Sequence, residues 1–95
     1  MSLEELVSKY IASAEKVFND LQISETPFTF DTKSVNGVVE FAKAYLDDAK
    51  YYMDRKRFEV SLASVAYCEG LLDALRLLGA VKFEWPKKGK REKER

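Results

Sequence analysis

The sequence predicts an all-α fold: a three-helix bundle with a long antiparallel helical hairpin and a short extended C-terminal segment. Apolar residues recur every three or four positions over residues 2–22 and again over 34–54, which is the period of an amphipathic helix. Residues 58–79 carry charges at only four positions, so a helix there is apolar over most of its circumference. Such a helix needs neighbours on several sides, and we place it at the centre of the bundle.

The first predicted helix covers residues 2–22. Ser2 is a suitable N-cap, and the acidic side chains of Glu4 and Glu5 suit the positive end of the helix dipole. The apolar stripe of this helix consists of Leu3, Leu6, Val7, Tyr10, Ile11, Ala14, Val17, Phe18 and Leu21. Pro27 and the loss of the helical period over residues 23–33 predict that the chain leaves the helix there.

The second predicted helix begins between Asp31 and Ser34. Its apolar seam is formed by Val35, Val38, Ala42, Tyr45, Ala49 and Tyr52. Residues 54–57 contain neither glycine nor proline, so local chemistry also permits one unbroken helix over residues 34–78. We favour a turn at 55–57, because an unbroken rod would leave the apolar sides of residues 58–79 exposed unless several chains associated.

A reversal at 55–57 sets the register of the hairpin. The expected neighbours are Ala49 with Ala63, Ala42 with Gly70, Val38 with Ala74, and Tyr45 with Tyr67. Small residues then face small residues, which allows the helix axes to approach near the short end of the usual ~8–10 Å range. We expect the first helix to cover the flank that bears Cys68, Leu72 and Leu75.

A glycine and an alternating segment follow the third helix. Gly79 is expected to end that helix as the C′ residue. Val81, Phe83 and Trp85 then alternate with charged residues, which predicts an extended segment with one apolar edge. We expect a single domain over residues 1–86 and a mobile basic tail over residues 87–95, where six side chains are basic and two are acidic.

The composition argues against several kinds of catalytic site. The chain has no histidine and one cysteine, Cys68, which removes catalytic triads, Glu-x-x-His di-iron sites and most zinc sites. We expect Cys68 to be a core residue and the protein to be non-enzymatic, without a cofactor. No apolar run approaches the ~20 residues that span a bilayer, and the N-terminus lacks the features of a signal peptide. The expectation is a cytoplasmic protein without a membrane segment.

Two carboxylates lie on one face of the third predicted helix. Glu69 and Asp73, with Asp47 or Asp48, could form an oxygen-rich magnesium site of a metal-dependent nucleotide hydrolase. Their spacing is one residue longer than the Glu-x-x-Glu and Glu-x-x-Asp pairs of helical nucleotide pyrophosphatases, and the second helix has no matching pair. We therefore favour a charged outer stripe in which Arg76 pairs with Asp73 at i+3. No metal ligand or catalytic residue is assigned.

Part of the hairpin resembles a known family. The residues that bear the likeness are Tyr45, Asp48, Ala49, Tyr52, Ala63, Ser64, Tyr67, Glu69, Gly70, Leu72, Asp73, Ala74, Leu75, Arg76 and Gly79. In these positions the chain resembles domain of unknown function 357, an uncharacterised and mainly archaeal helical family. Family members usually have a Gly-Asp pair in the turn, where this chain has Lys56 and Arg57. The resemblance implies a helical hairpin with no established activity.

The outer side of the third helix is our first candidate for a functional surface. Apolar side chains flank the charged stripe there, and three short helices cannot easily hide every side of the central one. We expect a homo-oligomer or a complex with another protein through Leu62, Val65, Glu69, Leu72, Asp73 and Arg76. The protein would then be a scaffold or adaptor module of unknown specific role.

The alternative function is a nucleotide or nucleic-acid binding accessory domain. Candidate phosphate contacts are Arg55, Lys56 and Arg57 in the turn and Lys87, Lys88, Lys90 and Arg91 in the tail. The third helix, ~30 Å long, separates the two clusters, so one protomer does not form a single basic face. A lysine-rich tail is also common as a solubilising extension.

Overall fold

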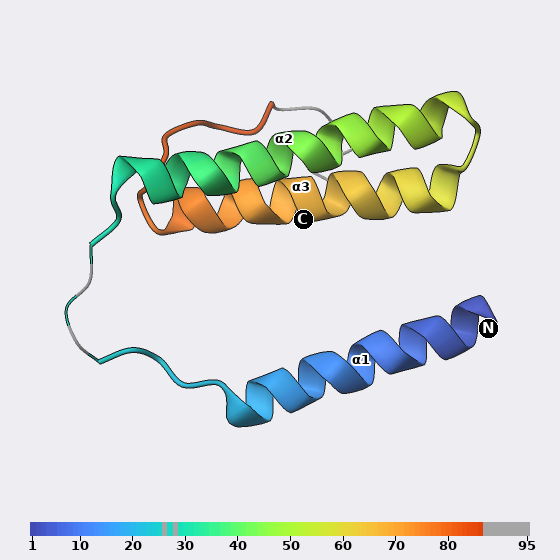
Figure 1. The fold of residues 1–95 in the computed structure, drawn as a ribbon, viewed down its shortest axis with the longest axis horizontal. Coiled ribbons are helices and arrows are strands. Elements are labelled where there is room, and N and C mark those ends of the chain that lie inside the picture. The colour runs from blue at the N-terminus through green and yellow to red at the C-terminus, as the bar shows by residue number, and fades with distance from the viewer. Residues whose placement is uncertain (26, 28, 87–95) are drawn as a thin grey trace.

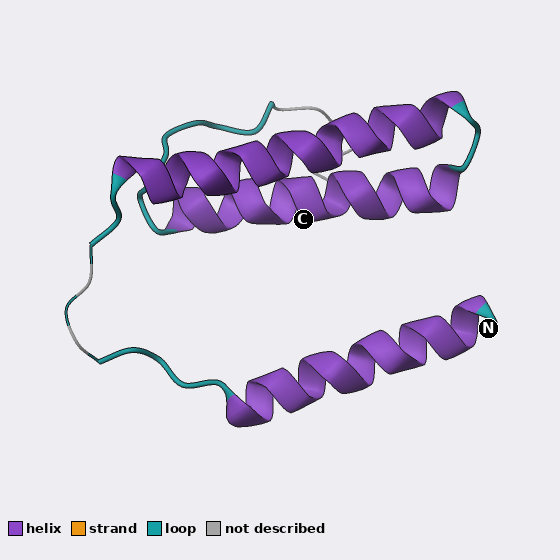
Figure 2. Ribbon diagram, viewed as in Figure 1, coloured by secondary structure: helices purple, strands orange, loops and turns teal. Residues whose placement is uncertain are grey.

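Three helices make up the described part of the chain: α1 (Leu3–Asp20), α2 (Thr32–Asp54) and α3 (Phe58–Leu77). The computed structural model describes residues 1–86 except Thr26 and Phe28, and no strand occurs among them (Figure 2). Helices α2 and α3 lie side by side in antiparallel directions, while α1 lies apart from them (Figure 1). The all-α class and the long antiparallel hairpin are thereby confirmed. The predicted tail over residues 87–95 lies outside the described residues.

Polar caps fix where the first two helices begin. At α1 the Glu5 amide donates to Ser2 Oγ over 3.1 Å, and the Ser2 amide donates to Glu5 Oε1 over 2.8 Å. At α2 the Ser34 amide donates to Asp31 Oδ1 over 2.7 Å. The hydrogen bonds that the Ser2 and Ser34 amides donate to the carboxylates of Glu5 and Asp31 hold the pKa values of these two groups below their usual range. Ser2 is therefore the N-cap of α1, and α2 begins where the sequence predicts.

The hairpin reverses at residues 55–57, as burial of the third helix requires. The Arg57 amide donates to the Tyr52 carbonyl over 2.9 Å and the Lys56 amide to the Met53 carbonyl over 3.0 Å, which is the Schellman pattern. Lys56 occupies the C′ position of this motif with φ of 61°, in the left-handed region that favours glycine. The chain thus makes a glycine-type turn without glycine, and the unbroken helix is excluded.

We expect Lys56→Gly to stabilise the protein by about 0.5–1 kcal/mol. The left-handed conformation costs a residue with a Cβ about 1–2 kcal/mol, and the extra freedom of glycine in the unfolded chain offsets part of the gain. Urea denaturation followed by circular dichroism measures the change, with Lys56→Ala as the control because alanine keeps the Cβ. An equal effect of both substitutions would show that backbone strain at this position is not the cause.

The core lies between α2 and α3. Its buried residues are Ala42 and Ala49 on α2 and Cys68 and Leu75 on α3. The α2 seam is thus the predicted one, and Tyr45 stacks on Tyr67 with ring centroids 4.4 Å apart, as the register requires. Ser61 Oγ donates to the Ala49 carbonyl over 2.7 Å, which ties the two helices together near the turn.

The face that α3 turns toward α2 differs from the prediction. Ala63, Gly70 and Ala74 are exposed, so their predicted pairing with Ala49, Ala42 and Val38 is wrong. Cys68 and Leu75 are buried in their place. Helix α3 is rotated about its axis relative to the prediction, although its register along α2 is as expected. The reason is that a helix apolar on most sides has no single face that periodicity can select.

Helix α1 does not cover the hairpin. None of its residues is buried, and α2 with α3 is the only helix pair in contact within the described residues. The expected packing of the first helix over Cys68, Leu72 and Leu75 is therefore wrong, since α2 buries Cys68 and Leu75. An apolar stripe identifies which side of a helix avoids water but does not identify the neighbour that covers it.

A second Schellman motif ends α3. Gly79 has φ of 81°, its amide donates to the Arg76 carbonyl over 3.0 Å, and the Ala80 amide donates to the Leu75 carbonyl over 2.9 Å. Beyond this C′ glycine the chain turns back along the hairpin (Figure 1). Phe83 and Trp85 are half-buried, whereas the intervening Glu84 is exposed, so the predicted alternation is confirmed.

Candidate interaction surface

The apolar stripe of α1 is exposed along the whole helix. Phe18 is 78% exposed, although it lies on the same side of the helix as the rest of the stripe. The large exposed side chains of the stripe are Leu3, Leu6, Val7, Tyr10, Ile11, Val17, Phe18 and Leu21. The polar side of α1 bears Lys16, which forms an ion pair of 3.0 Å with Asp20. Helix α1 is thus folded and amphipathic, with the apolar side in solvent.

The hairpin has an exposed apolar face. We define this open face by the exposed residues Phe41, Ala63, Tyr67, Ala74 and Leu78, with the half-buried seam residues Tyr45 and Tyr52 along its edge. Helical spacing places Phe41, Tyr45 and Tyr52 on one side of α2. The stacked Tyr45 and Tyr67 rings join this side to the matching side of α3. Phe41, Tyr67 and Leu78 are each more than half exposed.

The opposite flank of α3 contains the predicted partner residues. Leu62 is 68% exposed, while Val65, Glu69, Leu72, Asp73 and Arg76 are half-buried. Asp73 Oδ1 accepts hydrogen bonds from Arg76 Nε at 3.2 Å, Arg76 Nη2 at 3.1 Å and Trp85 Nε1 at 2.8 Å. The predicted pairing of Arg76 with Asp73 is confirmed. The Asp73 end of this flank is therefore engaged by the C-terminal segment of the same chain.

An aromatic cluster reinforces this contact. The Phe83 and Trp85 rings meet edge to face with centroids 4.9 Å apart, and the Arg76 guanidinium lies 5.9 Å from the Phe83 centroid. The sequence predicted an apolar edge for this segment but not its hydrogen bond to Asp73. An indole N–H and a carboxylate 12 positions apart give no periodic signal.

The predicted basic turn lies at one end of the hairpin. Arg55, Lys56 and Arg57 are all exposed. The Arg55 guanidinium lies 3.8 Å from the Tyr51 ring centroid, and that of Arg57 lies 5.5 Å from the Tyr52 centroid. Two of the three cations therefore stack on tyrosines of α2. The tail cations Lys87, Lys88, Lys90 and Arg91 lie outside the described residues.

The acidic side chains and Cys68 are the residues that bear on metal and thiol sites. Among residues 1–25, 27 and 29–86 no group of three or more Cys, Asp or Glu side chains is placed to hold a metal ion. Burial raises the pKa of the Cys68 thiol, with the charge of Glu69 as a smaller contribution. A raised pKa keeps the thiol protonated near neutral pH, which suits a core residue.

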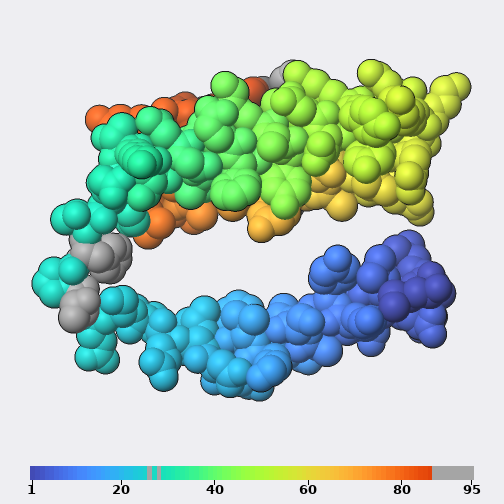
Figure 3. All heavy atoms as spheres, in the orientation of Figure 1, coloured from blue at the N-terminus to red at the C-terminus, as the bar shows by residue number. Residues whose placement is uncertain are grey.

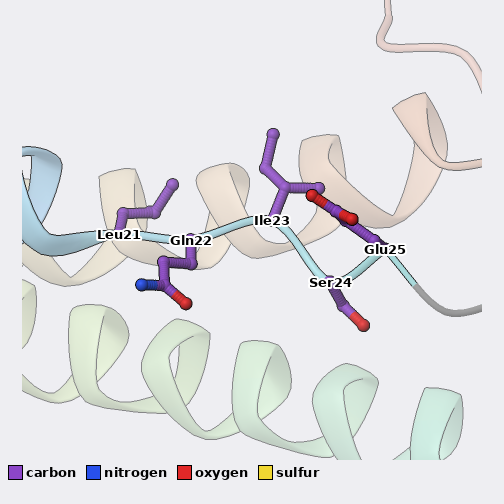
Figure 4. Close-up of a pocket in the computed structure, with 5 residues that line it drawn as sticks. All are labelled: Leu21, Gln22, Ile23, Ser24 and Glu25. Carbon is purple, nitrogen blue, oxygen red and sulfur yellow. The ribbon is translucent and has the colours of Figure 1, made fainter.

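A hollow lies along the connector between α1 and α2. Leu21, Gln22, Ile23, Ser24 and Glu25 line it, and all five are exposed. Leu21 and Ile23 point to one side of the extended backbone, while Gln22 and Ser24 point to the other (Figure 4). Among the described lining residues, Glu25 has the one ionisable side chain.

Sequence reasoning missed the open face, although a signal for it was present. The predicted register places Ala63, Tyr67 and Ala74 on one side of the third helix, in the hairpin seam. In the structure this side is exposed, and the space-filling view shows open space between α1 and the hairpin (Figure 3). Within the described residues, two apolar surfaces are therefore exposed, one on α1 and one on the hairpin.

A family model matches most of the chain. The family described as "Protein of unknown function (DUF357)" matches residues 9–81, which include most of α1, the connector, α2 and α3. No curated protein and no solved structure matches the chain. Within the described residues, none of the helices has the length and apolar character needed to cross a bilayer.

Proposed function

Because the chain belongs to the DUF357 family of unknown function, we propose a role from its surfaces: a non-enzymatic module that binds a protein through the apolar stripe of α1. The observation that supports this proposal is that α1 is folded and capped, yet none of its residues is buried. A large exposed apolar surface of this kind is typical of an interaction site.

The chemistry of the stripe indicates the kind of partner. A stripe of leucine, valine, isoleucine and aromatic side chains without a charge matches the apolar side of another helical surface. It does not match a phosphate backbone, which requires cations on the contacting face. The family match begins at residue 9, so the part of the stripe from Tyr10 onward lies within the matched region together with the hairpin.

Photocrosslinking in living cells tests this proposal. We expect Phe18→p-benzoylphenylalanine, which places the photoreactive group in the stripe, to give a discrete protein adduct on irradiation. The matched control is Asn19→p-benzoylphenylalanine, which lies on the polar side of α1 and should give far less of it. No adduct from position 18, equal adducts from both positions, or adducts with nucleic acid alone would overturn the proposal.

A further inference from the structure

We infer that the protein bound by α1 is a second copy of this chain, with α1 of each copy docked on the open face of the other. This inference rests on the proposed function and names its partner. Two such contacts related by a twofold axis form a closed dimer, because each copy both gives a helix and receives one.

The dimensions of the two surfaces match. Helix α1 has 18 residues and α3 has 20, which correspond to about 27 Å and about 30 Å. The α1 stripe is wider than a simple coiled-coil seam, because Ile11 and Phe18 extend it beyond the positions of Tyr10 and Val17. A wide stripe fits between two helices rather than against one. The open face offers such a place, with α2 on one side and α3 on the other.

Side-chain sizes are also complementary. Large side chains project from the stripe, whereas α3 presents Ala63 and Ala74 on the open face and Gly70 close beside them. Small residues at a contact let the axis of a neighbouring helix approach closely. The tyrosine rings of the open face would then border the docked helix.

The area is sufficient for a stable dimer. Burying one large apolar side chain removes roughly 60–120 Å² from water. The eight exposed side chains of the stripe therefore supply about 500–1,000 Å² per copy, which is close to the ~800 Å² that each partner buries in a standard interface. The formal net charge of the chain is zero, so two copies meet without net repulsion.

The arrangement of one chain favours docking between copies. Helix α1 lies beside the hairpin of its own chain but contacts neither of its helices (Figure 1). With four buried residues, the described chain has a very small core for its length. Exchange of α1 between two copies would cover both apolar surfaces at once.

Two measurements on the full chain test this inference. Sedimentation equilibrium gives the mass and the dissociation constant of the dimer. Cross-linking of lysines in an equal mixture of ¹⁵N-labelled and unlabelled chains then shows whether Lys9 and Lys16 of α1 reach the hairpin of the same copy or of the other. We expect a dimer in which the links from α1 to Lys43, Lys50 or Lys56 include links between one labelled and one unlabelled chain, which links within one copy cannot give.

A matched pair of variants locates the contact. Ala14→Asp puts a charge at the centre of the stripe and should weaken the dimer about a hundredfold or more, because the carboxylate would be buried without a partner. Ala12→Asp makes the same change on the opposite side of α1 and should leave the dissociation constant within about threefold. The inference would be overturned if both variants changed the dissociation constant equally, or if the cross-links between copies did not involve α1.

Two monomer outcomes separate this inference from the proposed function. A monomer in which all links from α1 lie within one chain would overturn both, since the stripe would be satisfied by its own hairpin. A monomer without links from α1 to the hairpin would overturn only the inference that the partner is a second copy. The stripe would then be free for a different protein, which the photocrosslinking experiment identifies.

Discussion

Leu75→Ala is expected to lower the free energy of unfolding by about 2–3 kcal/mol. Leu75 is 7% exposed and is the only large aliphatic side chain among the buried residues of the described chain. Truncation removes its apolar surface from the α2–α3 contact and leaves a cavity, for which leucine-to-alanine changes cost about 2–5 kcal/mol. We expect the lower half of this range because a two-helix layer can partly collapse around the gap. Urea denaturation at fixed protein concentration measures the loss.

Leu77→Ala is the matched control for this prediction. It is the same substitution two residues along α3, at a side chain that is 75% exposed. Its effect on the free energy of unfolding should stay within about 0.5 kcal/mol. Comparable losses at both positions would mean that α3 buries a different face from the one that contacts α2 in the structure.

The sequence predicts most local features of the fold, since each depends on residues close together in the chain. The Ser2 cap, the start of α2 after Asp31 and the glycine end of α3 are all such features. The α2 seam is also correctly predicted, because polar residues on the other sides of that helix leave a single apolar face. Burial alone predicts the turn at Lys56, although the residue type does not favour its conformation.

What the sequence does not predict is which surfaces meet. Helix α3 is apolar on nearly all sides, so Ala63 and Cys68 are equally acceptable neighbours for α2 until both helices are placed. The contact between Trp85 and Asp73 depends on how the chain turns after Gly79. For the candidate surface, the stripe of α1 is predictable from periodicity, whereas its exposure depends on the path of the connector.

Ala42→Leu is expected to lower the free energy of unfolding by about 2–3 kcal/mol, as much as the loss of Leu75. Ala42 is 1% exposed, on the side of α2 that contacts α3. A leucine there needs room for three more carbon atoms, and overpacking of this kind typically costs about 1–3 kcal/mol. We expect the upper part of this range, since the hairpin can make room only by separating its helices along their length. That separation would also lengthen the hydrogen bond from Ser61 to Ala49.

Ala44→Leu is the appropriate comparison, because Ala44 is exposed on the same helix and leucine has nearly the same helix propensity there. We expect no measurable loss of stability from it, so the difference between the two variants isolates packing from propensity. Amide exchange at residues 49–61 gives an independent reading, and it should accelerate in Ala42→Leu alone. If Ala42→Leu is as stable as the unchanged protein, the small residues of α2 do not set the distance between α2 and α3. The spacing of the two helices on either side of the open face would then differ from the spacing in the structure.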